Sequence, residues 1–250
     1  MPSFQSDGVR IAYWDEGEGE PILLIHGFAS NVATNWIDPG WVSTLKASGR
    51  RVIAFDNRGH GQSEKLYDPE RYGAPIMAED ARRLLDHLGI ERADVMGYSM
   101  GARISAFLVL KHPARVRSAI LAGLGINMVR GMVGTGPLAK ALEAKSIDEV
   151  TNDTARSFRA FAEHTKGDLR ALAACMRGSR EKITPDLLAG ITAPVLVAVG
   201  TEDVIGGSGA ELAALIPGAK LLDIKGRDHM KAVGDASFKR GVLDFLTQRV

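Results

Sequence analysis

The sequence predicts an α/β protein built on a mostly parallel, eight-stranded sheet with helices on both faces. Two observations predict this class. Short, continuous apolar runs recur along the chain, and such runs are typical of strands that are buried on both faces of a sheet. Helical patterns separate most of these runs, and strands that alternate with helices imply parallel pairing, because the crossover helices then cover the sheet.

The first two strands are expected to form a hairpin. Residues 3–6 and 9–16 flank Asp7-Gly8, a dipeptide that suits the positive φ angles of a two-residue turn. Apolar runs further along the chain predict six more strands, at residues 22–27, 51–56, 93–98, 116–123, 193–200 and 219–224.

Helical patterns are expected to cover this sheet. Between residues 77 and 88, apolar side chains recur at the i, i+3, i+4 spacing of one helix face, and the pattern stops at Gly89. The run 101–112 is helical in pattern and ends before Pro113, which cannot continue a helix. Residues 241–250 predict a closing helix.

Residues 125–190 interrupt the alternation of strands and helices. Helical patterns follow one another there without a convincing strand, and residues 154–165 and 168–178 each carry an apolar stripe. A helical insertion between two sheet strands would lie over one end of the sheet. We therefore expect a main domain of residues 1–124 and 191–250 and a helical cap of residues 125–190.

Composition and charge are those of an ordinary globular protein. Hydrophobic residues make up 45% of the chain and charged residues 24%, and 31 Lys and Arg balance 30 Asp and Glu. This balance gives no bulk electrostatic reason to expect nucleic acid or an anionic membrane as partner. The single cysteine, Cys175, cannot form an intramolecular disulfide, and no segment resembles a signal peptide or a membrane span. We therefore expect a cytoplasmic protein.

A serine between two glycines is the candidate nucleophile. In "DVMGYSMGARISAF", residues 94–107, an apolar strand ends at Ser99 and a helical pattern begins directly after it. So sharp a turn strains the backbone of the serine, and Gly97 and Gly101 are needed because side chains there would collide with the neighbouring strand and helix. The hydroxyl is then exposed at the positive end of a helix dipole.

A serine hydroxyl needs a neighbouring base that takes its proton. His229 follows the last predicted strand, at the same carboxyl edge of the sheet as Ser99. Asp203 follows the preceding strand and is expected to orient the imidazole, with Glu202 and Asp228 as rival acids. The other histidines compete poorly as the base: His26, His60, His87, His112 and His164.

Acyl transfer also requires donors for the negative charge that develops on the substrate oxygen. The backbone N–H of Met100, at the start of the helix after Ser99, is one expected donor. The N–H of Phe28, in the loop after the strand at 22–27, is the other. The Phe28 side chain could also serve as a hydrophobic plug or a pocket wall.

Five sequence blocks together resemble the signature of the α/β-hydrolase fold superfamily. They are "HGF" at 26–28, "DNRGHGQS" at 56–63, "GYSMGA" at 97–102, "GTEDVI" at 200–205 and "GRDHM" at 226–230. The blocks cover the main domain but not the cap, and they are similar to those of small bacterial serine esterases, enol-lactonases and carbon–carbon bond hydrolases. The resemblance also implies that the "DNRGHGQS" turn is structural, with no chemical role for Arg58 or His60.

The resemblance is specific for the fold and for the catalytic residues, but weakly specific for the reaction. A serine at the nucleophile position argues against haloalkane dehalogenases and epoxide hydrolases, which resemble this fold but place an aspartate there. No histidine or paired-cysteine spacing predicts a metal site, and no glycine-rich phosphate loop predicts a nucleotide cofactor.

We therefore interpret the sequence as that of a cofactor-independent serine hydrolase that cleaves small to medium carboxylic esters through an acyl-enzyme. The assigned groups are Ser99, His229 and Asp203, with the backbone amides of Phe28 and Met100 as oxyanion donors. The expected partner is a small-molecule acyl substrate. Three alternatives stay open: a carbon–carbon bond or enol-lactone hydrolase, a perhydrolase, and a ligand-binding receptor on the same fold.

Overall fold

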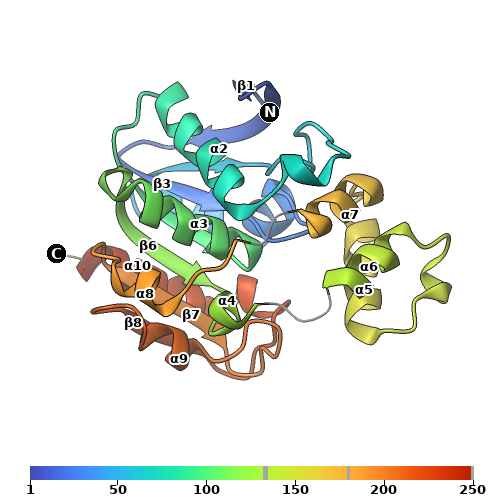
Figure 1. Cartoon of the computed structure of the whole chain (residues 1–250). Helices are drawn as coiled ribbons and strands as arrows, with labels where there is room; N and C mark the ends of the chain where they lie inside the picture. Colours follow the sequence, from blue (N-terminus) through green and yellow to red (C-terminus); the bar gives the residue numbers. More distant parts are fainter. Residues whose placement is uncertain (132–134, 179–180, 249–250) are drawn as a thin grey trace.

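The computed structural model describes residues 1–131, 135–178 and 181–248. Across these residues eight strands form one sheet, in the order β1-β2-β4-β3-β5-β6-β7-β8, and helices cover both faces (Figure 1). The strands are β1 Ser3–Ser6, β2 Val9–Glu16, β3 Glu20–Ile25, β4 Arg50–Phe55, β5 Ala93–Tyr98, β6 Val116–Ala122, β7 Val195–Gly200 and β8 Lys220–Ile224.

Helices lie both on the faces of the sheet and in the segment that joins β6 to β7. The helices are α1 Trp41–Ala47, α2 Ala74–His87, α3 Met100–Lys111, α4 Asn127–Arg130, α5 Thr135–Glu143, α6 Asp153–His164, α7 Leu169–Arg177, α8 Pro185–Ala189, α9 Gly209–Ala213 and α10 Ala236–Gln248. The chain also forms one π-helical turn, η1 Ala33–Ile37, and the 3-10 turns η2 Pro69–Arg71, η3 Pro113–Arg115, η4 Ile147–Glu149 and η5 Ala232–Gly234.

Strand pairing confirms the prediction of a mostly parallel sheet. β1 and β2 form the expected antiparallel hairpin, with φ values of 50° at Asp7 and 72° at Gly8. β2 also pairs antiparallel with β4, and every other strand pair is parallel. The chain passes from β3 to β4 on one side and then crosses to β5 on the other. The carboxyl ends of β3 and β5 therefore border the crevice where open parallel sheets bind ligands.

Alternate residues of each buried strand face opposite sides of the sheet, which explains the continuous apolar runs. In β3, Leu23 and Ile25 belong to the core under α2 and α3, whereas Ile22 and Leu24 belong to the core under α1 and α10. Each of these four side chains is fully buried.

The closing helix begins earlier than the predicted segment 241–250. α10 starts at Ala236, and the carboxylate of Asp235 accepts a hydrogen bond from the Ser237 N–H at 2.7 Å. This contact satisfies one of the backbone donors that are free at the start of a helix. Residues 249–250 of the predicted segment lie outside the described residues.

Residues 125–190, the segment that we expect to form a cap, include helices that pack in two different places. Apolar side chains of α5, α6 and α7 form a separate cluster with Phe28 and Tyr72. Figure 1 shows these three helices grouped beside the sheet, apart from the helices that cover its faces. Met128 of α4 and Leu188 of α8 instead pack into the core of the sheet. The cap itself stays a prediction, and its residues 132–134 and 179–180 lie outside the described residues.

A buried ion pair fastens the loop after β4 to α2. Arg58 donates from Nε and Nη2 to the two carboxylate oxygens of Asp80, each at 2.7 Å, and Nη1 donates to Arg71 O at 2.7 Å. The side chains are 2% and 0% exposed, so both charges depend on each other for solvation. These contacts agree with the structural role that the resemblance implies for Arg58.

Asp80→Asn should lower the free energy of unfolding by about 3–5 kcal/mol, because it leaves the Arg58 charge buried without a counter-ion. Urea denaturation measures the change. The matched control is Glu16→Gln, which breaks a 2.5 Å ion pair with Lys46 whose side chains are 39% and 40% exposed. That variant should lose less than about 1 kcal/mol. Equal losses in the two variants would contradict a special role for the buried pair.

Candidate active site

Ser99 occupies a tight turn between β5 and α3. Its φ of 55° lies in the left-handed region, which is strained for a residue with a side chain. A Cβ at Gly97 would lie 2.1 Å from Gly101 O, and a Cβ at Gly101 would lie 1.9 Å from Ile25 O. Only glycine therefore fits at these two positions, as the sequence predicts.

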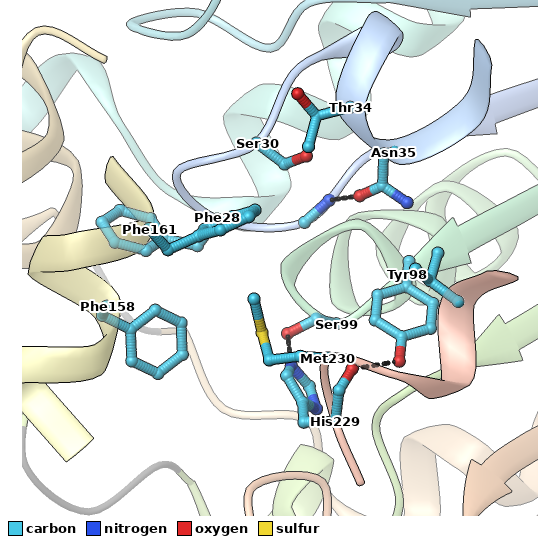
Figure 2. A pocket seen from close by; sticks show the side chains of 12 residues that line it. Phe28, Ser30, Thr34, Asn35, Tyr98, Ser99, Phe158, Phe161, His229 and Met230 are labelled. Atoms are coloured by element: carbon cyan, nitrogen blue, oxygen red, sulfur yellow. Dashed lines mark hydrogen bonds between the residues drawn. The ribbon is translucent and has the colours of Figure 1, made fainter. Parts of the chain in front are cut away.

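His229 and Asp203 lie in line with the Ser99 hydroxyl. The Nε2 atom of His229 is 3.0 Å from Ser99 Oγ, a contact that Figure 2 shows. Its Nδ1 atom is 2.8 Å from Asp203 Oδ2. Both side chains are buried, whereas Ser99 is partly exposed. The arrangement has the geometry of a nucleophile, a base within hydrogen-bond reach and an acid that orients the base.

Both oxygens of the Asp203 carboxylate have hydrogen-bond partners. While Oδ2 faces the imidazole, Oδ1 accepts hydrogen bonds from the N–H groups of Ile205 at 3.0 Å and Gly206 at 2.7 Å. The rival acid Asp228 instead accepts from the N–H groups of the turn that follows it, and its hydrogen bond to the Lys231 N–H is the largest cause of its lowered pKa. The other rival, Glu202, is exposed.

Tyr98 supports the backbone of His229. Its hydroxyl donates to the His229 backbone oxygen at 2.5 Å (Figure 2), and the two rings lie 5.6 Å apart. Burial raises the pKa of the Tyr98 phenol, with the charge of Asp203 as a further cause, so the hydroxyl stays a donor. Gly123 leaves space for the ring, because a Cβ there would lie 2.6 Å from it. No sequence pattern predicts a role for Tyr98, although it directly precedes Ser99.

The two expected oxyanion donors lie in the two backbone segments next to Ser99. Gly27 closely approaches the serine, since a Cβ at Gly27 would lie 3.4 Å from Ser99 Cβ, and its own N–H donates to Asn35 Oδ1 at 2.9 Å (Figure 2). Within the described parts of the chain, the next amide, that of Phe28, has no hydrogen-bond acceptor, and neither has the amide of Met100 at the start of α3.

Buried polar contacts fix the loop that carries Phe28. Asp56 accepts from the Val32 N–H at 2.8 Å and from the Gln62 N–H at 2.7 Å, so one carboxylate holds the loops after β3 and β4 together. His26 Nε2 accepts from the Asn57 N–H at 2.9 Å. Burial lowers the pKa of His26 to about 4, which keeps its imidazole neutral and suited to accept this bond.

His60, in the loop after β4, is also held by contacts of a structural kind. Its Nδ1 atom is 2.9 Å from Arg58 O, and its ring packs edge-on against Phe28 with centroids 5.7 Å apart. Burial, followed by the proximity of His26, lowers the pKa of His60 to about 3. A neutral imidazole at this position supports the wall of the site without a charge.

Helix α6 contacts the same loop from the other side. Thr165, at the end of α6, donates from Oγ1 to Ala29 O at 2.7 Å. Phe158 of α6 lies over Phe28, with ring centroids 6.1 Å apart. The loop after β3 is therefore bound both to the main sheet and to the helices between β6 and β7.

Two cavities open at Ser99. The first, of about 200 Å³, is bordered by His229 and by apolar side chains that include Phe161, Met230 and Val233 (Figure 2). The second, of about 230 Å³, is bordered by Met77, Leu124, Met176 and other side chains, and it shares Phe28, Ser99 and Phe158 with the first.

The described residues contain no cluster of three or more His, Cys, Asp or Glu side chains that could hold a metal ion. No helix within the same residues combines the length and the apolar character that crossing a membrane requires.

Comparisons with known proteins agree with this architecture. Residues 20–130 match the sequence model of a family described as alpha/beta hydrolase fold. The chain is similar to the 2-hydroxymuconate semialdehyde hydrolase of Pseudomonas sp. (strain CF600), with 40% identity over 116 residues. That match covers 46% of this chain and 40% of the relative, less than half the length of either protein.

Two further similarities extend over nearly the whole chain. The non-heme chloroperoxidase CPO-A1 of Kitasatospora aureofaciens is 30% identical over an alignment of 280 positions, which covers 97% of this chain and 98% of that protein. The crystal structure of the enol-lactonase from Burkholderia xenovorans LB400 matches with a TM-score of 0.81 and 25% identity, and covers 99% of this chain and 100% of that one. Together with the sheet topology, these matches show that the chain belongs to the α/β-hydrolase superfamily.

Proposed function

We propose that this chain is a cofactor-independent serine hydrolase that cleaves small to medium carboxylic esters through an acyl-enzyme. The observation that carries the proposal is the line of contacts from Ser99 Oγ through His229 to Asp203, with lengths of 3.0 Å and 2.8 Å. A serine in a strained turn, a base in reach and a buried acid behind it are the parts that acyl transfer requires.

In the first half of the reaction, Ser99 Oγ attacks the ester carbonyl carbon while His229 Nε2 takes the hydroxyl proton. The amides of Phe28 and Met100 donate to the oxygen that becomes negative. As the tetrahedral intermediate collapses, the carbon–oxygen bond to the alcohol breaks and His229 returns the proton to the leaving oxygen. Asp203 keeps the imidazole in the required tautomer and stabilises its positive charge.

The second half reverses these steps, with water in place of the alcohol. His229 takes a proton from water, the hydroxide attacks the acyl carbon, and the bond to Ser99 Oγ breaks as the serine regains its proton. The products are a carboxylic acid and free enzyme, and no redox step or external cofactor enters the balance.

A carbon–carbon bond or enol-lactone hydrolase is the second candidate. It is supported by the similarity to a 2-hydroxymuconate semialdehyde hydrolase and by the fold match to an enol-lactonase. The purified protein should be assayed against esters, lactones and vinylogous diketones with the acyl length varied. Preferential cleavage of a lactone or a diketone over every ester would favour this candidate.

The helices α5–α7 are proposed to act as a cap over the site. Phe158 and Phe161 of α6 face Ser99 and His229 across the first cavity (Figure 2). Such an apolar roof would exclude water and strengthen the oxyanion contacts. It would also select substrates by the length of their apolar groups.

Ser99→Ala should lower turnover by about 10⁴-fold or more, because no other group supplies the nucleophile. Labelling by a fluorophosphonate should disappear with it. Ser157→Ala is the matched control, because Ser157 is exposed on α6 and borders neither cavity. Persistent labelling of the Ser99→Ala protein would contradict the assignment.

Asp203→Asn should lower the rate by about 10³–10⁴-fold, because the amide presents the wrong hydrogen-bonding partner to His229. Steady-state kinetics measures the loss, and thermal denaturation checks that the fold is kept. Asp228→Asn is the control and should be nearly silent. A reversed pattern would mean that Asp228 is the orienting acid.

Replacing residues 135–178 by a short Gly/Ser linker should leave a folded main domain, because α4 and α8 pack into the sheet core and stay in place. The shortened protein should retain weak activity on small activated esters and lose discrimination by chain length. Kinetics on an acyl series checks this. An unchanged length preference would locate selectivity in the main-domain loops instead.

A further inference from the structure

Two strained backbone positions lie at the contact between the end of α6 and the loop after β3. In the part of the chain that the structure describes, four residues other than glycine have a positive φ: Asp7, Ala29, Ser99 and Lys166. Asp7 belongs to the β1–β2 hairpin, and Ser99 is the proposed nucleophile. Ala29, with a φ of 58°, and Lys166, with a φ of 55°, lie on the two sides of the hydrogen bond from Thr165 to Ala29 O. Strain of this kind persists only where surrounding contacts hold it, and it concentrates at functional sites.

The end of α6 directs the Thr165 hydroxyl toward the loop. The left-handed conformation of Lys166 lets the Gly167 N–H donate to Ala162 O at 2.8 Å, the closing bond of a Schellman motif. The Ala162 carbonyl therefore already has a donor. Thr165 Oγ1 lies 3.1 Å from Ala162 O but only 2.7 Å from Ala29 O. Because a hydroxyl has one proton, we assign that proton to the shorter contact, with Ala29.

His26 fixes the peptide group that contains the Phe28 N–H. Since His26 Nε2 accepts from the Asn57 N–H, its Nδ1 atom carries the proton and donates to Gly27 O at 2.7 Å. In a trans peptide the carbonyl oxygen and the amide hydrogen point in opposite directions. The contact at Gly27 O therefore directs the Phe28 N–H away from the buried imidazole.

The other end of this turn needs a contact of its own. The Ser30 N–H donates to Gly27 O at 3.3 Å and closes a four-residue turn, in which Ala29 takes the third position. A positive φ at that position normally requires glycine. The side chain of Ala29 therefore strains the turn, and the backbone can relax there unless its carbonyl is held. Thr165 supplies the donor to that carbonyl, so the turn keeps the Phe28 amide in one orientation.

We infer that Thr165 is a positioning residue for the oxyanion donor at Phe28. Thr165 borders neither cavity and acts through the carbonyl of Ala29. The inference rests on the proposed ester hydrolysis and adds to it the side chain that keeps this amide aimed at the substrate oxygen. A hydrogen bond weakens steeply as its angle departs from linearity. A loosened turn therefore lowers the rate of reaction without changing how tightly the uncharged substrate is bound.

Thr165→Val removes the hydroxyl and keeps the shape of the side chain. In the full-length protein it should lower kcat for ethyl butyrate by about tenfold, less than the loss of about 10²–10³-fold that follows complete removal of an oxyanion donor. KM should change less than about twofold, because both half-reactions use the same donor. Thr165→Ser keeps the hydroxyl and should hold kcat within about twofold of the unmodified protein. Thr154→Val makes the same change at an exposed position near the start of α6 and should leave kcat unchanged.

A pair of ketone inhibitors separates a change at the oxyanion contact from a change in the shape of the site. With a trifluoromethyl ketone, Ser99 Oγ bonds to the carbonyl carbon, the hydroxyl proton passes to His229, and the carbonyl oxygen becomes negative at the proposed oxyanion donors. The inhibition constant of this ketone should rise about tenfold in Thr165→Val. The methyl ketone of the same chain length forms no stable adduct, and its inhibition constant should change less than about twofold.

Thermal denaturation checks that each variant folds, and Thr165→Ala, which also lacks the hydroxyl, replaces the valine variant if that protein does not fold. A kcat for Thr165→Val within about twofold of the unmodified protein would overturn the inference. An equal rise in the inhibition constants of both ketones would indicate a reshaped site and would also overturn it, as would a loss in Thr165→Ser as large as that in Thr165→Val. Failure of the unmodified protein to cleave any ester would instead reject the proposed function, and the positioning role with it.

Discussion

Direct backbone contact between β3 and the first turn of α3 is the constraint on which the rest of the site depends. A Cβ at Gly101 would lie 1.9 Å from Ile25 O, so the helix can begin only where it has no side chain on that side. The turn before it then becomes so short that Ser99 adopts a positive φ. Strain at this one residue places its hydroxyl where the loops after β3, β7 and β8 converge.

Rigidity around the serine comes from polar groups that are buried together. Asp56 joins two loops through backbone amides, His26 accepts from Asn57, and Tyr98 holds the backbone of His229. A site assembled in this way needs little reorganisation when charge develops on a bound substrate, which is the condition for strong electrostatic stabilisation. The same contacts therefore contribute both to the stability of the fold and to the reactivity of the site.

Local sequence patterns predict much of this arrangement because they have a direct physical cause. Continuous apolar runs identify the strands, and Gly97 and Gly101 indicate the turn around Ser99, since each pattern depends on neighbours along the chain. The positions of Asp203 and His229 after successive strands follow from parallel topology. The packing of Leu188 into the main core, the support that Tyr98 gives to His229, and the ring contact between Phe158 and Phe28 depend on contacts between distant segments. No local pattern encodes those contacts.

The hydrogen bond from Thr165 to Ala29 O has a mechanical consequence. Ala29 directly follows Phe28, whose amide is the proposed oxyanion donor, and Thr165 directly follows the helix that carries Phe158. A displacement of α6 that widened the entrance would therefore pull on the donor loop as well. Substrate would then enter in one conformation of the molecule and react in another. Each catalytic cycle would have to pass through both conformations.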